Sequence, residues 1–234
     1  LVLNLHLHQN KAQISLDLGG GSLHKRGYRT SAGAAPLQET LAAAIIRASG
    51  WQGEEPMVDP MCGSGTLLAE ALMHYCRIPA AYLRTRFGVK YLPGHDPQLW
   101  EAVRKEANQA IRPLPDGLIR GSDISAANLD IATQNLSRLP YGGEVLLKTS
   151  DFNKLKAYNG LCIVTNPPYG IRIGEGGTIA NLYNELGNWL RTQCTGSTAV
   201  VLCGSTELAR ELKLRHRWLK NLKNGDLDTV LVKF

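Results

Sequence analysis

A short run at residues 165–170, "TNPPYG", follows the apolar stretch "LCIV" and combines groups that build neither a helix nor a strand. Pro167 and Pro168 lack an N–H, which fixes the local backbone and leaves carbonyl oxygens free to accept hydrogen bonds. Asn166 adds a side-chain oxygen, and Tyr169 adds an aromatic face. Two acceptors beside a stacking surface suit the exocyclic amine of a flat base, because accepting both N–H bonds favours a pyramidal nitrogen whose lone pair can attack a methyl carbon.

A second run, "MVDPMCGSGTLLAEA", places an acid, Asp59, at the end of a predicted strand and then Gly63 and Gly65 before a predicted helix. Glycines in such a turn let the backbone approach a ligand at the helix N-terminus. The third glycine of the dinucleotide pattern G-x-G-x-x-G is missing, and a carboxylate here repels a pyrophosphate but attracts an ammonium or a sulfonium. The pattern favours S-adenosylmethionine over NAD; the alternative is a tight turn that binds no ligand.

Two further acids follow at the ends of the next predicted strands. Asp123 ends "IRGSD", a position from which a carboxylate can accept hydrogen bonds from ribose hydroxyls. Asp151 ends the strand after that, where it could accept from an adenine amino group while Phe152 packs nearby. Taken singly, each acid is more typical of a helix cap or a turn. Together with Asp59 they indicate one cofactor site.

These side chains need a sheet whose strands end at a common edge. Short apolar runs alternate with helical segments, which predicts an α/β fold with a doubly wound, Rossmann-like, mostly parallel sheet covered on both faces. Ligands bind at the carboxyl ends of the strands in such sheets. The strands are predicted at residues 56–60, 118–123, 144–151, 161–168 and 198–204, and the helices at 36–49, 65–76, 97–111, 125–139, 178–193 and 206–213.

The two ends of the chain differ from this alternating series. At the start, "LVLNLHLH" and "AQISLDL" alternate apolar and polar residues, which predicts a small antiparallel hairpin with one buried face. "GGGS" at residues 19–22 predicts a flexible break and a domain boundary. At the other end, Asn224-Gly225 between "LRHRWLKNLK" and "DLDTVLVKF" predicts a terminal antiparallel hairpin. Residues 79–93 fit neither period and are predicted to be an irregular insertion.

Composition limits the class of protein. The chain has 234 residues with 44% hydrophobic, enough to bury a core, and it shows neither a long apolar run nor a signal peptide, so no membrane partner is expected. It does not begin with Met, as expected of a piece of a longer protein or of a shortened chain. Five cysteines without a C-x-x-C pair argue against disulfides and a zinc site, so we expect a reducing cytoplasm and no metal.

Charge indicates the kind of partner. The formal net charge is +6, which favours a polyanionic partner through Lys and Arg contacts to phosphates. Basic residues gather at residues 210–223, "RELKLRHRWLKNLK", around Trp218. A phosphate track with a stacking point and a plain edge strand with a charged outer face explain this segment equally well.

Three runs together carry a family resemblance. "DPMCGSGT", "TNPPYG" and the upstream "RGYRTSAGAAPLQETLAAAI" resemble class I S-adenosylmethionine-dependent methyltransferases that act on exocyclic amines of nucleobases. The strongest likeness is to the methyltransferase half of bacterial large-subunit (23S) rRNA guanine-N2 methyltransferases of the K/L type. N-P-P-Y is shared with adenine-N6 and cytosine-N4 DNA methyltransferases and with release-factor glutamine methyltransferases, and the upstream run narrows the choice. The resemblance implies that residues 1–27 are the end of a THUMP-like RNA-binding domain with its linker, and residues 28–234 the methyltransferase domain.

The resemblance also implies a reaction and a site. A methyl group would pass from S-adenosylmethionine to guanine N2 in large-subunit rRNA or its assembly precursor, after the base leaves its stack. No metal is implied. By that likeness the methionine end of the cofactor is held by Asp59, Cys62, Gly63, Ser64 and Gly65, the ribose by Asp123, the adenine by Asp151 and Phe152, and the guanine by the catalytic motif Asn166, Pro167, Pro168 and Tyr169.

Three other functions compete with this one. A related enzyme could act on adenine N6 in DNA or on guanine N2 in tRNA, although a THUMP-like start favours RNA. A catalytically silent RNA-binding module could keep the cofactor fold, but it would not need the amine-binding acceptors of residues 166–169. A nicotinamide-dependent oxidoreductase conflicts with the acid at Asp59 and with the missing glycine.

Overall fold

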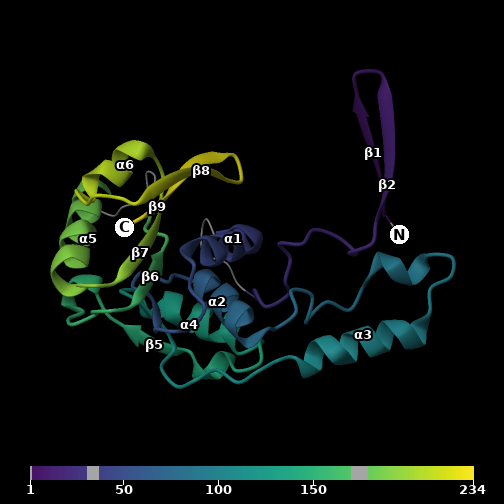
Figure 1. Ribbon diagram of the computed structural model, residues 1–234, viewed down its shortest axis with the longest axis horizontal. Coiled ribbons are helices and arrows are strands. Elements are labelled where there is room, and N and C mark those ends of the chain that lie inside the picture. The colour runs from purple at the N-terminus through teal and green to yellow at the C-terminus, as the bar shows by residue number, and fades with distance from the viewer. Residues whose placement is uncertain (1, 31–36, 170–178) are drawn as a thin grey trace.

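The computed structural model of the chain describes residues 2–30, 37–169 and 179–234. They form a two-stranded sheet near the N-terminus and a seven-stranded sheet with helices on both of its faces (Figure 1). The large sheet has the strand order β5-β4-β3-β6-β7-β9-β8, parallel from β5 to β7, with β9 antiparallel to both of its neighbours. This confirms the predicted doubly wound α/β fold with a terminal antiparallel hairpin. The strands are β3 (Met57–Asp59), β4 (Ile119–Asp123), β5 (Leu146–Thr149), β6 (Cys162–Thr165), β7 (Thr198–Cys203), β8 (Trp218–Asn224) and β9 (Leu227–Lys233).

Among the described residues, six α-helices occupy the segments where sequence periodicity predicts them. Side-chain caps begin several: Asp96 accepts from two backbone N–H groups at the start of α3, and Ser125 accepts from the Asn128 N–H at the start of α4. Pro36 and Thr178, the predicted first residues of two helices, lie outside the described residues. The helices are α1 (Glu39–Ser49), α2 (Thr66–Cys76), α3 (Pro97–Gln109), α4 (Ala126–Leu136), α5 (Ile179–Gln193) and α6 (Thr206–Glu211), with 3-10 turns η1 (Gly88–Tyr91), η2 (Gly142–Glu144) and η3 (Phe152–Lys154).

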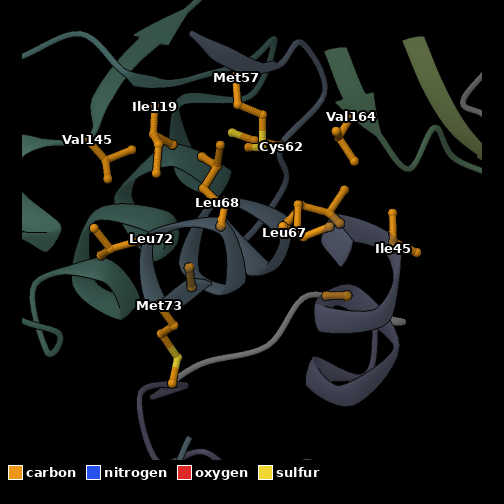
Figure 2. Packing of buried hydrophobic residues seen from close by; sticks show 14 of the residues in the cluster. Ile45, Met57, Cys62, Leu67, Leu68, Leu72, Met73, Ile119, Val145 and Val164 are labelled. Carbon is orange, nitrogen blue, oxygen red and sulfur yellow. The ribbon is translucent and has the colours of Figure 1, made fainter. Parts of the chain in front are cut away.

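The central strands bury both of their faces, because successive side chains point to opposite sides of a sheet. Val164 packs in the cluster on the α1 and α2 side, and its neighbour Ile163 packs in the cluster on the α5 side. Figure 2 shows Leu67 and Leu68 of α2 among the residues of the first cluster. Continuous apolar strands such as β6 and β7 are therefore what this covered sheet requires.

The terminal hairpin differs from the prediction in two details. β8 begins at Trp218, so the predicted strand start at Leu214 was wrong by four residues. Asn224 pairs with Leu227, which makes Gly225-Asp226 the two-residue turn in place of Asn224-Gly225. Gly225 has φ +63, a left-handed conformation that glycine adopts without steric cost.

The N-terminal hairpin, β1 (Val2–His8) and β2 (Lys11–Asp17), projects away from the large sheet (Figure 1). Its cross-strand pairs place Leu3, Leu5, Leu7, Ala12, Ile14 and Leu16 on one face. The prediction that this face is buried is wrong for the described residues: Leu5 is 62% exposed and Ile14 is 71% exposed. Alternation of apolar and polar residues predicts an apolar face, but it does not predict which residues pack against that face.

The glycine-rich segment after β2 is held by hydrogen bonds, a feature that the prediction of a flexible break did not include. The Asp17 carboxylate accepts from the N–H groups of residues 19–21. Arg84, within the irregular insertion, donates to the carbonyl groups of Gly19, Gly21, Ser22 and Lys25. Gly88 fits tightly against the Asp17 backbone, where a Cβ would lie 1.9 Å from the Asp17 oxygen. The insertion therefore braces the base of the hairpin.

Several properties of the described residues bear on function. The five cysteines are all buried and unpaired. Within residues 2–30, 37–169 and 179–234, no group of three or more His, Cys, Asp or Glu side chains is arranged to hold a metal. No helix in the same ranges is both long enough and apolar enough to cross a membrane.

Candidate cofactor and target-base site

The site lies where the order of the sheet reverses. From β3 the chain proceeds outward through β4 and β5, and then returns to the other side of β3 with β6. Such a reversal leaves a crevice at the carboxyl ends of the strands. A cavity of about 560 Å³ occupies this position, and its lining comes from the ends of all four strands, from α4 and from α5. The lining residues are Pro60, Met61, Gly63, Asp123, Ile124, Ser125, Asn128, Ser150, Asp151, Phe152, Asn153, Asn166, Pro168, Leu182 and Glu185.

Asp123 is fixed on the cavity wall by three donors. Its Oδ2 accepts from the N–H of Gly63 at 2.9 Å. Its Oδ1 accepts from the N–H of Ser125 at 2.9 Å and from Nδ2 of Asn128 at 3.1 Å. A carboxylate offers about four lone-pair positions, so this one keeps acceptor capacity for a ligand hydroxyl. Its place at the end of β4 agrees with the predicted ribose contact.

Asp151 and Phe152 form the next part of the wall, just beyond β5. Asp151 caps the short helix η3 by accepting from the N–H of Asn153 at 2.9 Å. The Phe152 ring packs edge-on against Trp189, with 6.1 Å between ring centroids. A carboxylate and a fixed aromatic ring thus stand side by side, as a flat heterocycle with an amino group requires.

Asp59 lies behind the cavity and is 1% exposed. Its Oδ1 accepts from the Thr165 hydroxyl at 2.7 Å and from the N–H of Met61 at 3.1 Å. Burial raises the pKa of Asp59 to about 7, and these two hydrogen bonds act in the opposite direction. A cation bound nearby would favour the ionised form. Asp59 does not itself line the cavity.

The turn between β3 and α2 has the geometry that its glycines predicted. Gly65 has φ +80, and a Cβ there would lie 3.1 Å from Cβ of Ala132. The Ser64 carbonyl accepts from Nδ2 of Asn135 at 3.0 Å, and Cys62 is buried in the core. Among the predicted turn residues 62–65, Gly63 lines the cavity, and the cofactor contacts predicted for all four stay predictions.

The N-P-P-Y motif follows β6 and faces the cofactor side of the crevice. Asn166 and Pro168 line the cavity, whereas Pro167 and Tyr169 do not. Oδ1 of Asn166 is buried and has no hydrogen-bond partner among the residues that the structure describes. The Tyr169 hydroxyl accepts a 2.8 Å hydrogen bond from Nδ2 of Asn224. Gly170 and the glycine-rich stretch after it lie outside the described residues.

Comparison with known families decides what kind of domain this is. Residues 26–233 match the profile of the RMKL-like methyltransferase domain. The chain belongs to this family. The likeness predicted from the sequence motifs is therefore confirmed at the level of the family, and the cavity described above is the candidate site of an RMKL-like domain.

Relatives of this RMKL-like domain are longer than the chain. The ribosomal RNA large subunit methyltransferase K/L of Photobacterium profundum is 38% identical over 237 residues, which are 99% of this chain and 33% of that protein. The crystal structure of SMU.472, a candidate methyltransferase complexed with S-adenosylhomocysteine, has 31% identity and a TM-score of 0.90 over 99% of this chain and 60% of its own. The structure of a predicted N6-adenine-specific DNA methylase from Listeria monocytogenes has 28% identity and a TM-score of 0.84 over 99% and 60%. The chain thus spans between a third and three fifths of these proteins.

Sequence reasoning missed several residues of the RMKL-like site. Ile124 follows Asp123 directly, and its side chain is 74% exposed in the structure. An apolar residue directly after the acid at a predicted strand end is a signal that the sequence offered. Asn128 stands three residues after the Ser125 cap and could have been found on the same helix turn. Leu182 and Glu185 line the cavity because of where α5 packs on the sheet. No local sequence pattern predicts that position.

Proposed function

We propose that this chain transfers a methyl group from S-adenosylmethionine to the exocyclic N2 amine of a guanine in large-subunit rRNA. The observation that carries the proposal is Oδ1 of Asn166, a buried acceptor without a partner among the described residues, on a cavity that Asp123 and Asp151 also line. An unpaired buried acceptor costs about 1–3 kcal/mol. An amine N–H of a bound base would satisfy it.

The residues of the cavity fit S-adenosylmethionine, which supplies a methyl group bonded to a positively charged sulfur. Asp123 accepts hydrogen bonds from the ribose hydroxyls, and Asp151 with Phe152 holds the adenine. The turn at residues 62–65 holds the methionine end, and the buried Asp59 behind the cavity attracts its positive charge, which in turn favours the ionised carboxylate. The S-adenosylhomocysteine in the crystal structure of SMU.472 supports this assignment.

On the target side, the N-P-P-Y motif positions the base. Oδ1 of Asn166 and the Pro167 carbonyl accept the two N–H groups of the amine, so that its lone pair points toward the methyl carbon. Pro168 fixes the local backbone conformation, and the Tyr169 ring stacks on the base. The new C–N bond forms as the C–S bond breaks, and the amine then releases one proton to solvent. Positioning supplies most of the rate, and no strong base is needed.

The relatives support the choice of substrate. The Photobacterium relative is named for methylation of large-subunit ribosomal RNA, and the net charge of +6 suits a phosphate-rich partner. We therefore assign this activity to rRNA or its assembly precursor in the cytoplasm, with no metal.

We also propose that residues 1–27 are the end of a THUMP-like RNA-binding domain with its linker, and that residues 28–234 are the methyltransferase domain. The apolar hairpin face and the bracing of its base by Arg84 support a docked segment of a larger unit. Arg26 pairs with the buried Glu70 at 3.2 Å, and Tyr28 is 1% exposed, so the chain enters the catalytic core at these residues.

A second candidate is methylation of adenine N6 in DNA. The description of the Listeria structure favours it, and the same acceptors at Asn166 and Pro167 would suit the adenine amine. The two candidates differ in their product and not in their cofactor.

Calorimetric titration with S-adenosylmethionine, followed by incubation with unmodified large-subunit rRNA and nucleoside mass spectrometry, tests the proposal. We expect cofactor binding and the formation of N2-methylguanosine. N6-methyl-2′-deoxyadenosine formed in a parallel incubation with unmethylated DNA would establish the second candidate. Absence of cofactor binding would overturn both.

A further inference from the structure

The side chain of Tyr169 is held by a residue far from its own motif. The hydrogen bond from Nδ2 of Asn224 joins two positions 55 apart in the sequence. Asn224 is the last residue of β8, next to the Gly225-Asp226 turn. The tip of the terminal hairpin therefore reaches the loop that follows β6, although three elements of chain separate them.

The ring of Tyr169 is also confined at Gly204, just after β7. A Cβ at this glycine would lie 2.5 Å from Cβ and 2.7 Å from Cγ of Tyr169, so a larger residue would displace the tyrosine. Tyr169 packs on the α1 and α2 side of the core, as do Trp218 and Leu222 of β8. Contacts at Gly204 and at the hydroxyl thus define both ends of the side chain.

The two ends differ in what they control. Packing at Gly204 fixes the position of Cβ and Cγ of Tyr169. The hydrogen bond from Asn224 to the tyrosine hydroxyl limits rotation of the side chain. Asn166 and Pro168 line the cavity, and Tyr169 follows them directly without lining it, so a base that docks against this motif meets a ring whose orientation is set from the hairpin. Orientation matters because a misplacement of about 1 Å can cost about 100-fold in rate.

We propose that Asn224 is a positioning residue for Tyr169: by holding the tyrosine hydroxyl, the terminal hairpin orients the ring against which the target base stacks. This inference rests on the proposed function, since the stacking role is assigned there. The new element is the role of the hairpin. It lies outside the motifs recognised in the sequence, yet it orients a residue that contacts the target base.

Five variants test the inference: Asn224→Ala, Asn224→Asp, Tyr169→Phe, the double variant of Asn224→Ala with Tyr169→Phe, and Asn221→Ala. The last is the matched control, an exposed asparagine on the same strand. We expect Asn224→Ala to lower kcat about 10-fold with the Kd for S-adenosylmethionine unchanged. Asn221→Ala should keep the activity of the parent chain. Asn224→Asp, which can accept the tyrosine proton, should restore most of kcat.

The double variant separates positioning from a general effect on folding. Once Tyr169→Phe has removed the hydroxyl, Asn224→Ala should have no further effect on kcat. Two effects that multiply would show that Asn224 acts elsewhere, and a kcat for Asn224→Ala equal to that of Asn221→Ala would overturn the inference directly.

A readout without RNA keeps this test distinct from that of the proposed function. In protein labelled with 3-fluorotyrosine, the ¹⁹F resonance missing in Tyr169→Phe belongs to Tyr169. We expect Asn224→Ala to shift or broaden this resonance and Asn221→Ala to leave it in place; an unchanged resonance would sink the inference. If the parent chain methylates another nucleoside, the proposed specificity fails, and the kcat comparison is made on that product.

Discussion

The two halves of the large sheet, which meet between β3 and β6, are organised in different ways. On the cofactor half, Asp123 and Asp151 accept hydrogen bonds from their own or adjacent turns, at positions 125, 128 and 153, and Asp123 also accepts from Gly63 in the glycine turn after β3. On the target half, Asn166 has an unpaired oxygen among the described residues and Tyr169 depends on Asn224, 55 positions away. The donors to the two acids of the cofactor half thus lie in turns at the ends of the strands, whereas on the target half Tyr169 is held by the terminal hairpin and Asn166 keeps an acceptor for a bound base.

The largest expected effect concerns Asp59, which lies at the junction of the halves. Its pKa is raised from 3.8 to about 7 by burial, so the folded protein favours the protonated form. A raised carboxyl pKa contributes stability at low pH that is lost as the pH rises from about 4 to about 7, up to about 4 kcal/mol. Relative to Asp59→Asn, the cofactor-free protein should therefore lose stability across this window.

Chemical unfolding at pH 4 and pH 7 measures the difference. Saturating S-adenosylmethionine should reduce the loss, because its positive charge favours the carboxylate. An equal pH response in the two proteins would mean that burial does not raise the pKa of Asp59. The junction between the two halves would then hold an ordinary ionised carboxylate.

Asn166→Ala tests the target half. We expect kcat to fall about 100- to 1,000-fold, since an acceptor aimed at the reacting amine is removed, while the Kd for the cofactor stays within about twofold. Asn166→Asp is the conservative control, because it keeps an acceptor of the same size and should retain more activity than the alanine variant. Titration and single-turnover kinetics separate the two quantities, and loss of cofactor binding in the alanine variant would make Asn166 part of both halves.

Asp123→Ala makes the reciprocal test on the cofactor half. The Kd for S-adenosylmethionine should rise about 100-fold, because hydrogen bonds to a charged acceptor contribute about 1.5–3 kcal/mol and the Gly63 N–H loses its partner. At saturating cofactor, kcat should recover toward the parent value. A kcat that stays low at saturation would indicate that the halves are coupled more tightly than the local contacts of Asp123 suggest.

Gly204→Ala has the smallest expected effect and sharpens the description of the target half. The added Cβ meets Tyr169, so the tyrosine must shift, with a loss of about 1–3 kcal/mol in the free energy of unfolding and lower kcat. Gly143→Ala is a suitable control, because no atom of the described residues lies within 4 Å of the added Cβ. Thermal unfolding compares the two variants, and an identical response would show that Tyr169 accommodates the change.

The same contrast explains how much of the site could be predicted from sequence. Asp123, Asp151 and Gly63 were predicted because a strand end, a cap and a glycine turn are local features that a short motif records. Asn224 could not be predicted, since its role depends on where β8 lies after β7 and β9 have paired. The mostly parallel sheet and the burial of both of its faces were predictable from apolar runs separated by helices.

The wrong expectations at the two hairpins have physical causes. Asn224-Gly225 and Gly225-Asp226 are both suitable turns, and pairing across the strands selects the second. The alternation in β1 and β2 specifies an apolar face, but burial depends on what surrounds it. A pattern in one segment carries no information about its neighbours in space.

The five buried cysteines have a practical consequence for labelling chemistry. A thiol reacts as its thiolate, and burial raises the pKa of Cys76 to about 11 and those of Cys162, Cys194 and Cys203 to about 12, with Cys62 raised as well. A maleimide at neutral pH should leave the native protein unmodified. Lys223→Cys, at an exposed position of β8, would then give a single attachment point for a fluorophore beside Asn224. The native thiols would need no prior removal.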